Sequence, residues 1–395
     1  MMSEGVQPRP SGTTRSLVGV LLPFMMSAYS AFSISMIVVQ LAHAFSTTVS
    51  AVLLAIPLDF IGGALGGVVM GYLADRYGRR PLLVASSAIF GAAVLAAAAA
   101  GNIWEIYAAW FIAGFGVNSQ NGISYPVVVE TLRRSTGTIG GAMQSLYFIG
   151  FLLDSLTYMY FHWWRTYLVI VGVASLILSV PPAAMIRETA RRSARRAGIR
   201  SLGGRLVLYT VAFSAVVAGA FMLSVPLMGV VPTLLYGMGM GAIYVSAFSL
   251  VGFVSFVLAG YLSDRLGRAA STAAFAALGV VSSIALAFAG APAYFLAALT
   301  AVYVSSGFFS FTGVWASESY PMELRATATN IVFLVGRLLG GFSPMLVIAL
   351  YPSSLRVGLG MSGAISAALA LVGVAIYVLA GRMRREAPRD PRAVA

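Results

Sequence analysis

Three ionisable side chains stand inside long apolar stretches of the sequence: Asp59, Asp154 and Arg337. A charge at the centre of a bilayer costs roughly 2.5–3.5 kcal/mol or more, so a residue kept there is a candidate for function. A buried carboxylate can take up and release a proton, and a guanidinium can hold an anionic group through two parallel hydrogen bonds. The sequence therefore predicts proton binding at the two aspartates and anion binding at Arg337.

Asp59 and Arg337 are expected at similar depths in the membrane. Asp59 precedes Asp75 by 16 residues, and Arg337 follows Arg325 by 12. In helices these separations are about 24 Å and about 18 Å, and an Arg side chain can cover the difference of about 6 Å. Small residues on the same faces favour close helix packing: Gly62, Gly63, Gly66 and Gly67 beside Asp59, and Gly340, Gly341 and Pro344 beside Arg337. We expect the two side chains to approach each other, either as a static ion pair or as a pair that separates during function.

Asp154 follows Gly137 by 17 residues, which places it about 25 Å along its helix. It either lines a vestibule at that end or reaches the membrane interface together with the aromatic residues that follow it, Tyr158, Tyr160 and Trp163. Both interpretations stay open.

The elements that position these residues are membrane-spanning helices. Of 395 residues, 59% are hydrophobic and 9% are charged, which excludes a soluble fold. Twelve apolar runs are each long enough to cross about 30 Å of hydrocarbon as a helix. The predicted spans are 17–41, 47–74, 81–100, 103–129, 137–160, 164–186, 206–232, 241–263, 271–290, 293–318, 326–351 and 357–381.

The basic residues divide and orient the chain. The Arg-rich segment 187–205 is interpreted as a cytoplasmic linker between six-helix bundles at 17–186 and 206–381, with an arm at 1–16 and a tail at 382–395. All 25 basic residues are Arg, and 22 of them lie on one side of the predicted spans. The positive-inside rule then places both termini in the cytoplasm of a multi-pass cell-membrane protein. The net charge of +13 indicates this topology and contact with anionic lipids, not nucleic-acid binding.

The residue types that many enzymes need are missing from the sequence. There is no Cys, and the two His, His43 and His162, have no metal-ligand spacing. No nucleophile-base pair or phosphate-binding loop is visible. We predict no enzyme activity, no catalytic residue, no metal and no cofactor, and we interpret Glu105, three residues after Asn102, as part of a helix capping box.

One loop motif occurs twice. The segment Gly71–Arg80 (GYLADRYGRR) returns as Gly260–Arg268 (GYLSDRLGR), 189 residues later, and the acids Glu130 and Glu318 lie 188 residues apart. Two markers at nearly one offset indicate an internal repeat. Because an even number of spans separates the copies, the two halves face the same way.

The repeated loop, in a chain of six plus six helices, resembles the major facilitator superfamily over nearly the whole chain. Further segments resemble its metabolite:proton symporters and their aromatic-acid, organic-ion and sugar-porter relatives: Val231–Leu234, Glu318–Thr327, Gly336-Arg337 and Arg187–Arg191. The resemblance implies an all-α membrane protein in which two six-helix bundles form a parallel pseudo-repeat and rock around a central cavity.

The resemblance also implies a conformational latch at the loop motifs. By this resemblance, Asp75 would hold the second span to the start of the eleventh and would pair with Arg133 or Arg134. Glu130 would join the same charge network. Gly71 leaves room for a neighbouring helix, and an Asp beside a helix start favours the positive end of that helix dipole. The alternative is that these charges only anchor loops at the lipid headgroups. The other members of the latch are Arg76, Arg79, Arg80, Asp264, Arg265, Arg268, Glu318 and Arg325.

Within this resemblance the charged residues of the spans acquire roles. Arg337 would bind a carboxylate, as the Gly-Arg pair of organic-anion relatives implies, and Asp59 would carry a proton. Two positions where relatives place acids are neutral here, Ser30 and Gln120. Either Asp59 or Asp154 has taken over proton coupling, or the protein is a uniporter or exchanger.

Uncharged side chains are predicted to orient the substrate. The amides among them line a cavity or tie adjacent helices together, and the Trp lines the cavity or packs inside the bundle. These residues are Asn118, Gln120, Asn121, Gln144, Tyr29 and Trp315.

The sequence thus predicts a secondary active transporter that couples a small organic anion to protons by alternating access. Its partners would be the organic acid, protons and membrane lipids, and a monomer suffices to form the cavity. Three alternatives stay open: a proton-coupled exporter of drugs or organic cations, a sugar-type carrier, and a membrane sensor that does not translocate.

Overall fold

Helices make up almost all of the described chain. The computed structural model describes the backbone of residues 10–132, 136–186, 205–320 and 325–386. Within these ranges, the side chains of residues 10–14, 75, 121–123, 125–132, 136, 205, 325–327, 330 and 382–386 are not described. In lipid a helix satisfies its own backbone hydrogen bonds, which water cannot do there. Eleven helical segments of the described residues are long and apolar enough to cross a membrane.

The helices follow the predicted spans in order. The first half contains α1 (Pro10–Ala31), α2 (Ile34–Ala44), α3 (Val49–Leu53), α4 (Ala55–Tyr77), α5 (Arg79–Ala97), α6 (Ile103–Leu132), α7 (Thr136–Tyr160) and α8 (Trp164–Ala184). The second half contains α9 (Arg205–Gly229), α10 (Val231–Gly237), α11 (Ala242–Leu266), α12 (Arg268–Phe288), α13 (Pro292–Ser305), η2 (Ser306–Phe308), α14 (Phe309–Ser319), α15 (Arg325–Gly341), α16 (Ser343–Leu350) and α17 (Leu355–Glu386). The predicted fourth span corresponds to α6.

Several predicted spans consist of two helices with a break between them. The first span breaks between α1 and α2, the second between α3 and α4, the seventh between α9 and α10, and the eleventh between α15 and α16. Proline stands in the first turn after three of these breaks, as Pro57, Pro232 and Pro344. A proline is tolerated there because the first backbone N–H groups of a helix have no intrahelical acceptor. Backbone hydrogen bonds still cross the breaks, as from Leu58 N–H to the Leu54 carbonyl, so each break is a change of direction where a bending point can form.

The repeated motif is preserved in the backbone geometry. Gly78, between α4 and α5, has φ 102°, and Gly267, between α11 and α12, has φ 88°. Only glycine adopts this region easily, so the two glycines turn the chain in the same way in both halves. The close approach predicted at Gly71 is found at its counterpart instead. A Cβ added to Gly260 would lie 2.9 Å from the Cα of Gly141, whereas one added to Gly71 would meet no described atom within 4 Å.

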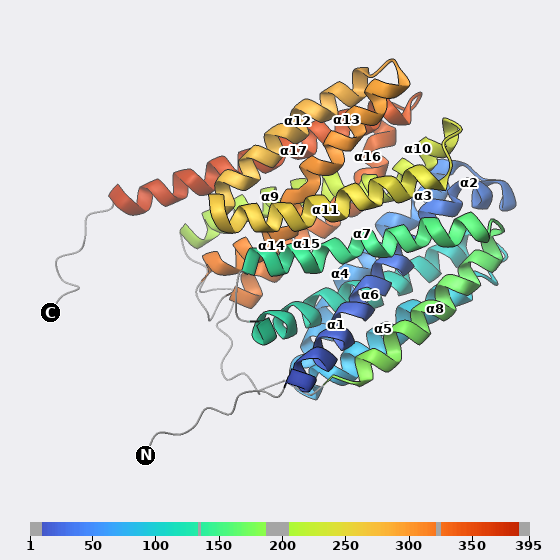
Figure 1. Cartoon of the computed structure of the whole chain (residues 1–395), viewed down its shortest axis with the longest axis horizontal. Coiled ribbons are helices and arrows are strands. Elements are labelled where there is room, and N and C mark those ends of the chain that lie inside the picture. Colours follow the sequence, from blue (N-terminus) through green and yellow to red (C-terminus); the bar gives the residue numbers. More distant parts are fainter. Residues whose placement is uncertain (1–9, 133–135, 187–204, 321–324, 387–395) are drawn as a thin grey trace.

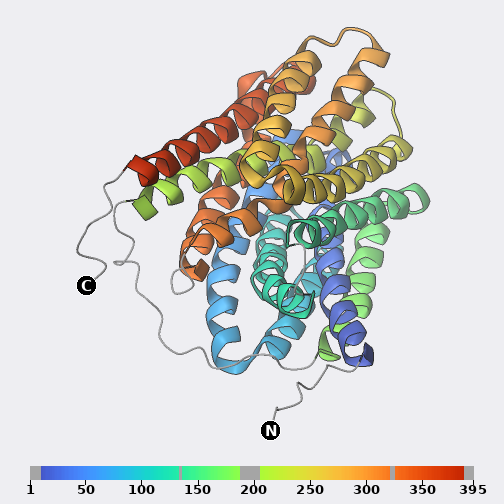
Figure 2. The ribbon, with the colours of Figure 1, turned by 60° about the vertical axis from the view of Figure 1, so that its left-hand side comes forward.

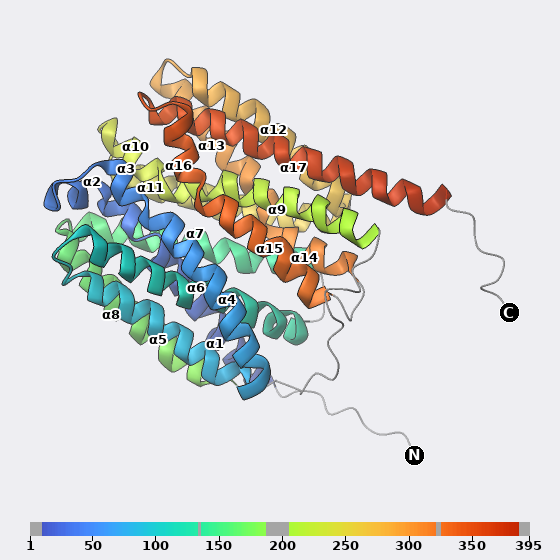
Figure 3. The same ribbon diagram turned by 180° about the vertical axis from the view of Figure 1, so that it is seen from behind.

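The two halves lie side by side along one boundary. Figure 1 and the reverse view in Figure 3 show α1–α8 on one side and α9–α17 on the other. Within the second half, α17 runs alongside α9 (Figure 2). Across the boundary α7 packs on α11, α4 on α15 and α14 on α7. We call the end that carries Gly78 and Gly267 the motif end, and the end that carries α2, α3 and α10 the pocket end (Figure 1).

Candidate functional site

Asp59 lies in α4, where α4 packs very closely on α6. Cβ atoms added to Gly62 and Gly66 would overlap backbone carbonyls of α6, and one added to Gly114 of α6 would overlap the backbone of Asp59. This contact leaves Asp59 3% exposed, and its Oδ1 has no hydrogen-bond partner. A charged carboxylate is costly in such a place because nothing in its described surroundings compensates the lost hydration.

Arg337 approaches the same helix from the second half. Its Nη1 lies 3.2 Å from the position of a Cβ added to Gly67, and its Cζ lies 5.8 Å from the centre of the Phe333 ring. One turn further along α15, Gly341 faces the Phe60 side chain. The predicted contact between the second and eleventh spans is therefore present, and it is made by α4 and α15.

Asp59 and Arg337 lie at different levels of this contact. Gly67, which Arg337 faces, is eight residues beyond Asp59, or about 12 Å along α4. The ion pairs between described side chains do not include one between Asp59 and Arg337. The predicted approach is not made in this conformation. The separation arises from the direction of the Arg337 side chain, because Gly341, one turn further along α15, faces Phe60 beside Asp59, whereas Arg337 Nη1 points to Gly67.

Of the three candidate amides on α6, Gln120 hydrogen-bonds to a neighbouring helix. Gln120 is fully buried, and its Nε2 donates to Ser86 Oγ at 3.1 Å and to Ser87 Oγ at 2.8 Å. These bonds tie α6 to α5, in agreement with the second interpretation of this amide. Asn118 packs against Gly63 of α4, and its Nδ2 lies 3.5 Å from the carbonyl oxygen of Gly114. The side chain of the third candidate, Asn121, lies outside the described residues.

The other predicted substrate ligands have three different environments. Gln144 of α7 is 5% exposed, and no hydrogen bond holds its amide in the described part of the chain. The Tyr29 hydroxyl of α1 is 2.8 Å from Thr157 Oγ1 of α7. Trp315 packs between aromatic rings, with ring centres 4.9 Å from Phe213 and 4.8 Å from Tyr377. Gln144 is thus the amide in this group that remains available to a ligand.

Asp154 is enclosed within the first half of the chain. It has no exposed surface, and the Tyr167 hydroxyl of α8 donates to its Oδ1 at 2.6 Å, while its Oδ2 has no partner. The Tyr167 ring packs edge-on against Tyr158 at 5.7 Å. Asp154 therefore neither lines a described pocket nor reaches the surface, in contrast to both positions that the sequence suggested. Its partner Tyr167 could not be inferred, since no sequence pattern links α7 to α8.

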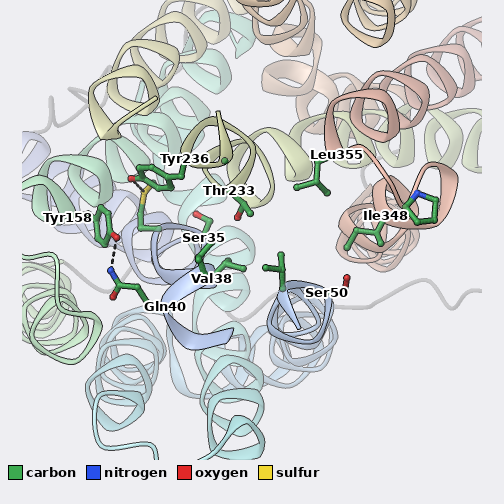
Figure 4. A pocket seen from close by; sticks show the side chains of 14 residues that line it. Ser35, Val38, Gln40, Ser50, Tyr158, Thr233, Tyr236, Ile348 and Leu355 are labelled. Carbon is green, nitrogen blue, oxygen red and sulfur yellow. Dashed lines mark hydrogen bonds between the residues drawn. The ribbon is translucent and has the colours of Figure 1, made fainter. Parts of the chain in front are cut away.

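A pocket of about 630 Å³ lies at the pocket end, between the two halves (Figure 4). It was not predicted from the sequence, although Thr233 belongs to a segment, Val231–Leu234, that carried the family resemblance. Gln40 Nε2 donates to the Tyr158 hydroxyl at 2.7 Å, and the Tyr236 hydroxyl donates to Met36 Sδ at 3.8 Å. The lining contains no charged residue: Ser35, Met36, Val38, Val39, Gln40, Val49, Ser50, Tyr158, Thr233, Tyr236, Gly237, Ile348, Pro352 and Leu355.

At the motif end, Asp264 binds the start of α7. Its Oδ1 accepts the backbone N–H of Gly137 at 3.1 Å, and its Oδ2 accepts the backbone N–H and the hydroxyl of Thr138 at 2.8 Å and 2.7 Å. Arg268 donates to Asp264 Oδ1 at 2.7 Å and forms two bonds of 3.2 Å with Glu318. A carboxylate at a helix start is stabilised by the free N–H groups and the helix dipole. The second copy of the motif thus joins α11 of one half to α7 of the other.

The remaining latch residues are only partly placed. Arg265 stacks on the Tyr261 ring at 4.5 Å and Arg76 lies 5.6 Å from the Tyr77 ring, so neither takes part in the contact with α7. Arg79 and Arg80 lie in the first turn of α5. The side chains of Asp75, Glu130, Arg133, Arg134 and Arg325 are outside the described residues.

Comparisons with known proteins agree with this architecture. The chain is 27% identical over 341 residues to the niacin transporter NiaP of Acinetobacter baylyi, covering 74% of this chain and 76% of that protein. It is 26% identical over 362 residues to the 3-(3-hydroxy-phenyl)propionate transporter of Escherichia coli, covering 82% and 83%. The solved proton:xylose symporter XylE superposes with a TM-score of 0.73 over 93% of this chain and 96% of that one, at 18% identity, and so shares the fold. The family model described as Major Facilitator Superfamily matches residues 20–344. This chain, a multi-pass membrane transporter and not an enzyme, belongs to the major facilitator superfamily.

Proposed function

We propose that this transporter couples a small organic anion, and an aromatic carboxylate in particular, to protons by symport. The observation that carries the proposal is the position of Arg337. It is a half-buried guanidinium on α15 that faces Gly67 of the other half, at the boundary where alternating access opens and closes. A charged side chain inside the spans is expensive, so it is a candidate for function. An arginine also matches a carboxylate in geometry because its planar fork offers two parallel donors.

The named relatives support an aromatic acid as the substrate. Niacin and 3-(3-hydroxy-phenyl)propionate are the molecules in the names of two of them. Phe333, whose ring lies beside the Arg337 guanidinium, would offer an apolar face next to the carboxylate group. Gln144 would hydrogen-bond a polar substituent of the substrate, since its amide is not engaged elsewhere in the described chain. Gln120 is left out of the proposed ligands because Ser86 and Ser87 occupy its donor.

Asp59 is proposed as the proton carrier. Its buried Oδ1 lacks a hydrogen-bond partner, and it lies on the same helix as the glycine that Arg337 faces. A change in the direction of the Arg337 side chain as the halves rock would bring the guanidinium to the carboxylate. In this cycle Asp59 is protonated when Arg337 holds the substrate, and it is charged when the two side chains pair. Proton and substrate would then move together, because Arg337 cannot bind the Asp59 carboxylate and the substrate carboxylate at once.

The proposal includes how the two bundles move and which end of the molecule faces the cytoplasm. The halves 17–186 and 206–381 would rock against each other, with segment 187–205 as the linker. The Arg-rich motif end would face the cytoplasm, following the positive-inside rule. Asp264, Arg268 and Glu318 would then act as a latch on the cytoplasmic side.

The test is substrate-driven proton movement in proteoliposomes that contain a trapped pH-sensitive dye. Benzoate, nicotinate, an aliphatic carboxylate, xylose and a quaternary ammonium ion are added outside in turn. We expect internal acidification with an aromatic carboxylate. Asp59→Asn should abolish the acidification, whereas Asp59→Glu, which keeps the titratable group, should retain part of it.

Arg337→Gln and Arg337→Lys separate anion binding from a structural role. The Gln variant should lose carboxylate transport, and the Lys variant, which keeps the charge but loses the fork, should transport with a raised KM. Alkalinisation by the quaternary ammonium ion, unchanged in Arg337→Gln, would instead identify an exporter of cations. Uptake of xylose without any response to carboxylates would identify a sugar-type carrier.

A further inference from the structure

The pocket at the pocket end is built by both halves of the molecule. Tyr158 belongs to α7 and Gln40 to α2, while Thr233 and Tyr236 belong to α10 and Leu355 begins α17 (Figure 4). Its volume of about 630 Å³ lies within the range of small-molecule sites. The Arg337 site is a separate place on α15, because Arg337 is not among the residues that line this pocket.

Hydrogen-bond donors in this lining are poorly used. The Thr233 hydroxyl is buried without a partner, and the residue is only 7% exposed. The Tyr236 hydroxyl donates to a thioether sulfur at 3.8 Å, which is a weak acceptor. The Tyr158 hydroxyl accepts a bond from Gln40, and among the described residues no acceptor takes its own proton. A buried hydroxyl without a partner costs about 1–3 kcal/mol, so an acceptor brought by a ligand would be favoured.

The rest of the lining determines what kind of ligand fits. Val38 and Ile348 are apolar walls, and the two tyrosines present rings whose centres are 5.7 Å apart. No Arg, Lys, His, Asp or Glu takes part in the lining. A carboxylate would therefore lose its hydration there without gaining a cationic partner, whereas an uncharged carbonyl or hydroxyl would lose little.

We propose that this pocket binds a small uncharged molecule that has an aromatic body and a carbonyl or hydroxyl oxygen facing Thr233 and Tyr236. The site goes beyond anion transport, and its occupancy can be measured whether or not the protein carries an anion. An occupant would touch α7 and α10 together and hold the two halves in the arrangement seen here. Uncharged analogues of a carboxylate substrate would thus act as inhibitors at a second site.

The experiment measures equilibrium binding of radiolabelled benzamide and of benzoate to the purified full-length protein in lipid nanodiscs. We expect saturable binding of benzamide that survives Arg337→Gln. Thr233→Val removes the hydroxyl at nearly constant volume and should weaken benzamide binding by about 2- to 12-fold, the range of one net hydrogen bond. Ser50→Trp, at an exposed edge of the pocket, should occupy part of it and weaken saturable binding. The matched control is Thr300→Val, because Thr300 bonds within its own helix to Leu296 and does not line the pocket.

Three results would overturn the proposal. The first is the absence of saturable benzamide binding, which would leave lipid as the occupant. The second is binding that neither Thr233→Val nor Ser50→Trp changes. The third is loss of benzamide binding in Arg337→Gln, which would place the probe at the anion site. Failure of anion transport in the proteoliposome experiment has no bearing on these outcomes, so the two proposals can fail separately.

Discussion

Replacement of Asp264 by Asn should open the motif end of the molecule. The carboxylate accepts three hydrogen bonds from the start of α7, from the N–H of Gly137 and from the N–H and hydroxyl of Thr138. Exchanging a charged for a neutral acceptor costs about 1 kcal/mol per bond, and loss of the charge at the helix start costs about 0.3–1 kcal/mol. The Asp264 side chain is 22% exposed, and solvent screens a contact of this kind, so we take about 1–2 kcal/mol for the whole change. The contact between α11 and α7 should then open about 5- to 30-fold more often.

Cysteine labelling measures this opening directly. The natural sequence contains no Cys, so a single introduced thiol is the only reactive one. Ser310 of α14 is suitable because it is 1% exposed and its carbonyl lies 3.4 Å from the position of a Cβ added to Gly140 of α7. In the Ser310→Cys protein, Asp264→Asn should raise the rate of maleimide alkylation by the same 5- to 30-fold.

Arg265→Gln is the matched control for this experiment. It changes the neighbouring residue by one charge, but Arg265 stacks on Tyr261 and makes no hydrogen bond or ion pair with the described part of α7. Equal alkylation rates in the Asp264→Asn and Arg265→Gln proteins would refute the latch. A similar rise for a thiol placed at Ser155, near the pocket end, would refute it too, because that result would indicate general loosening.

Three further predictions follow from the packing and hydrogen bonding of the spans. Gly66→Ala should lower the midpoint of thermal unfolding in detergent, since its Cβ would overlap a carbonyl of α6 at a cost of about 1–3 kcal/mol, whereas Gly67→Ala meets only the mobile end of Arg337 and should change the midpoint little. Gln120→Leu should lower the unfolding midpoint and leave KM for the transported acid unchanged. Gln144→Leu should leave the unfolding midpoint unchanged and change KM; the opposite pattern would exchange the roles of the two residues. Asp154→Asn should leave proton movement coupled to substrate in the proteoliposome assay, because the enclosed carboxylate has no described route to a pocket, and loss of coupling would transfer the proton from Asp59 to this residue.

The fold could be predicted from the sequence to a large extent, and the reason is physical. Lipid requires each span to be helical and long enough to cross the hydrocarbon, so the runs of hydrophobic residues give the spans and their order. The two loop glycines, Gly78 and Gly267, share an offset in sequence and a positive φ in the structure, which preserves the repeat. The capping box is confirmed as well, since Asn102 Oδ1 accepts the Glu105 N–H at 3.1 Å. All of these features depend on residues close together in the chain or on a simple repeat.

The breaks within the spans could not be predicted from hydrophobicity. A window of apolar residues does not change at Leu54 or Phe342, where one helix ends and another begins. The prolines just after these breaks are visible in the sequence, but a proline is tolerated equally inside α1, where Pro23 lies within an unbroken helix. Which proline marks a break depends on the neighbouring helices, which supply the missing partners for freed backbone groups.

The candidate site was predicted less well, because polar residues inside a membrane have two possible partners. A neighbouring helix can satisfy them, as Ser86 and Ser87 satisfy the amide nitrogen of Gln120 and as Tyr167 satisfies one oxygen of Asp154. A substrate can also satisfy them, and the sequence does not distinguish these cases since both place a polar residue in an apolar run.

The structure offers a criterion for finding polar residues that a ligand or a second conformation would use. A polar group that keeps an unused donor or acceptor at depth lowers stability, and it persists where a ligand or a second conformation uses it. By this criterion Gln120 is a divided case, because its Nε2 bonds to Ser86 and Ser87 while its Oε1 is buried without a partner. Asp59 and Thr233 each keep a buried oxygen without a partner, and we propose that function accounts for both. They mark two different places, one beside the α4–α15 contact and one in the pocket between the halves. A transporter that binds its anion at the first place and an uncharged molecule at the second would explain why both unpaired groups are retained although they lower stability.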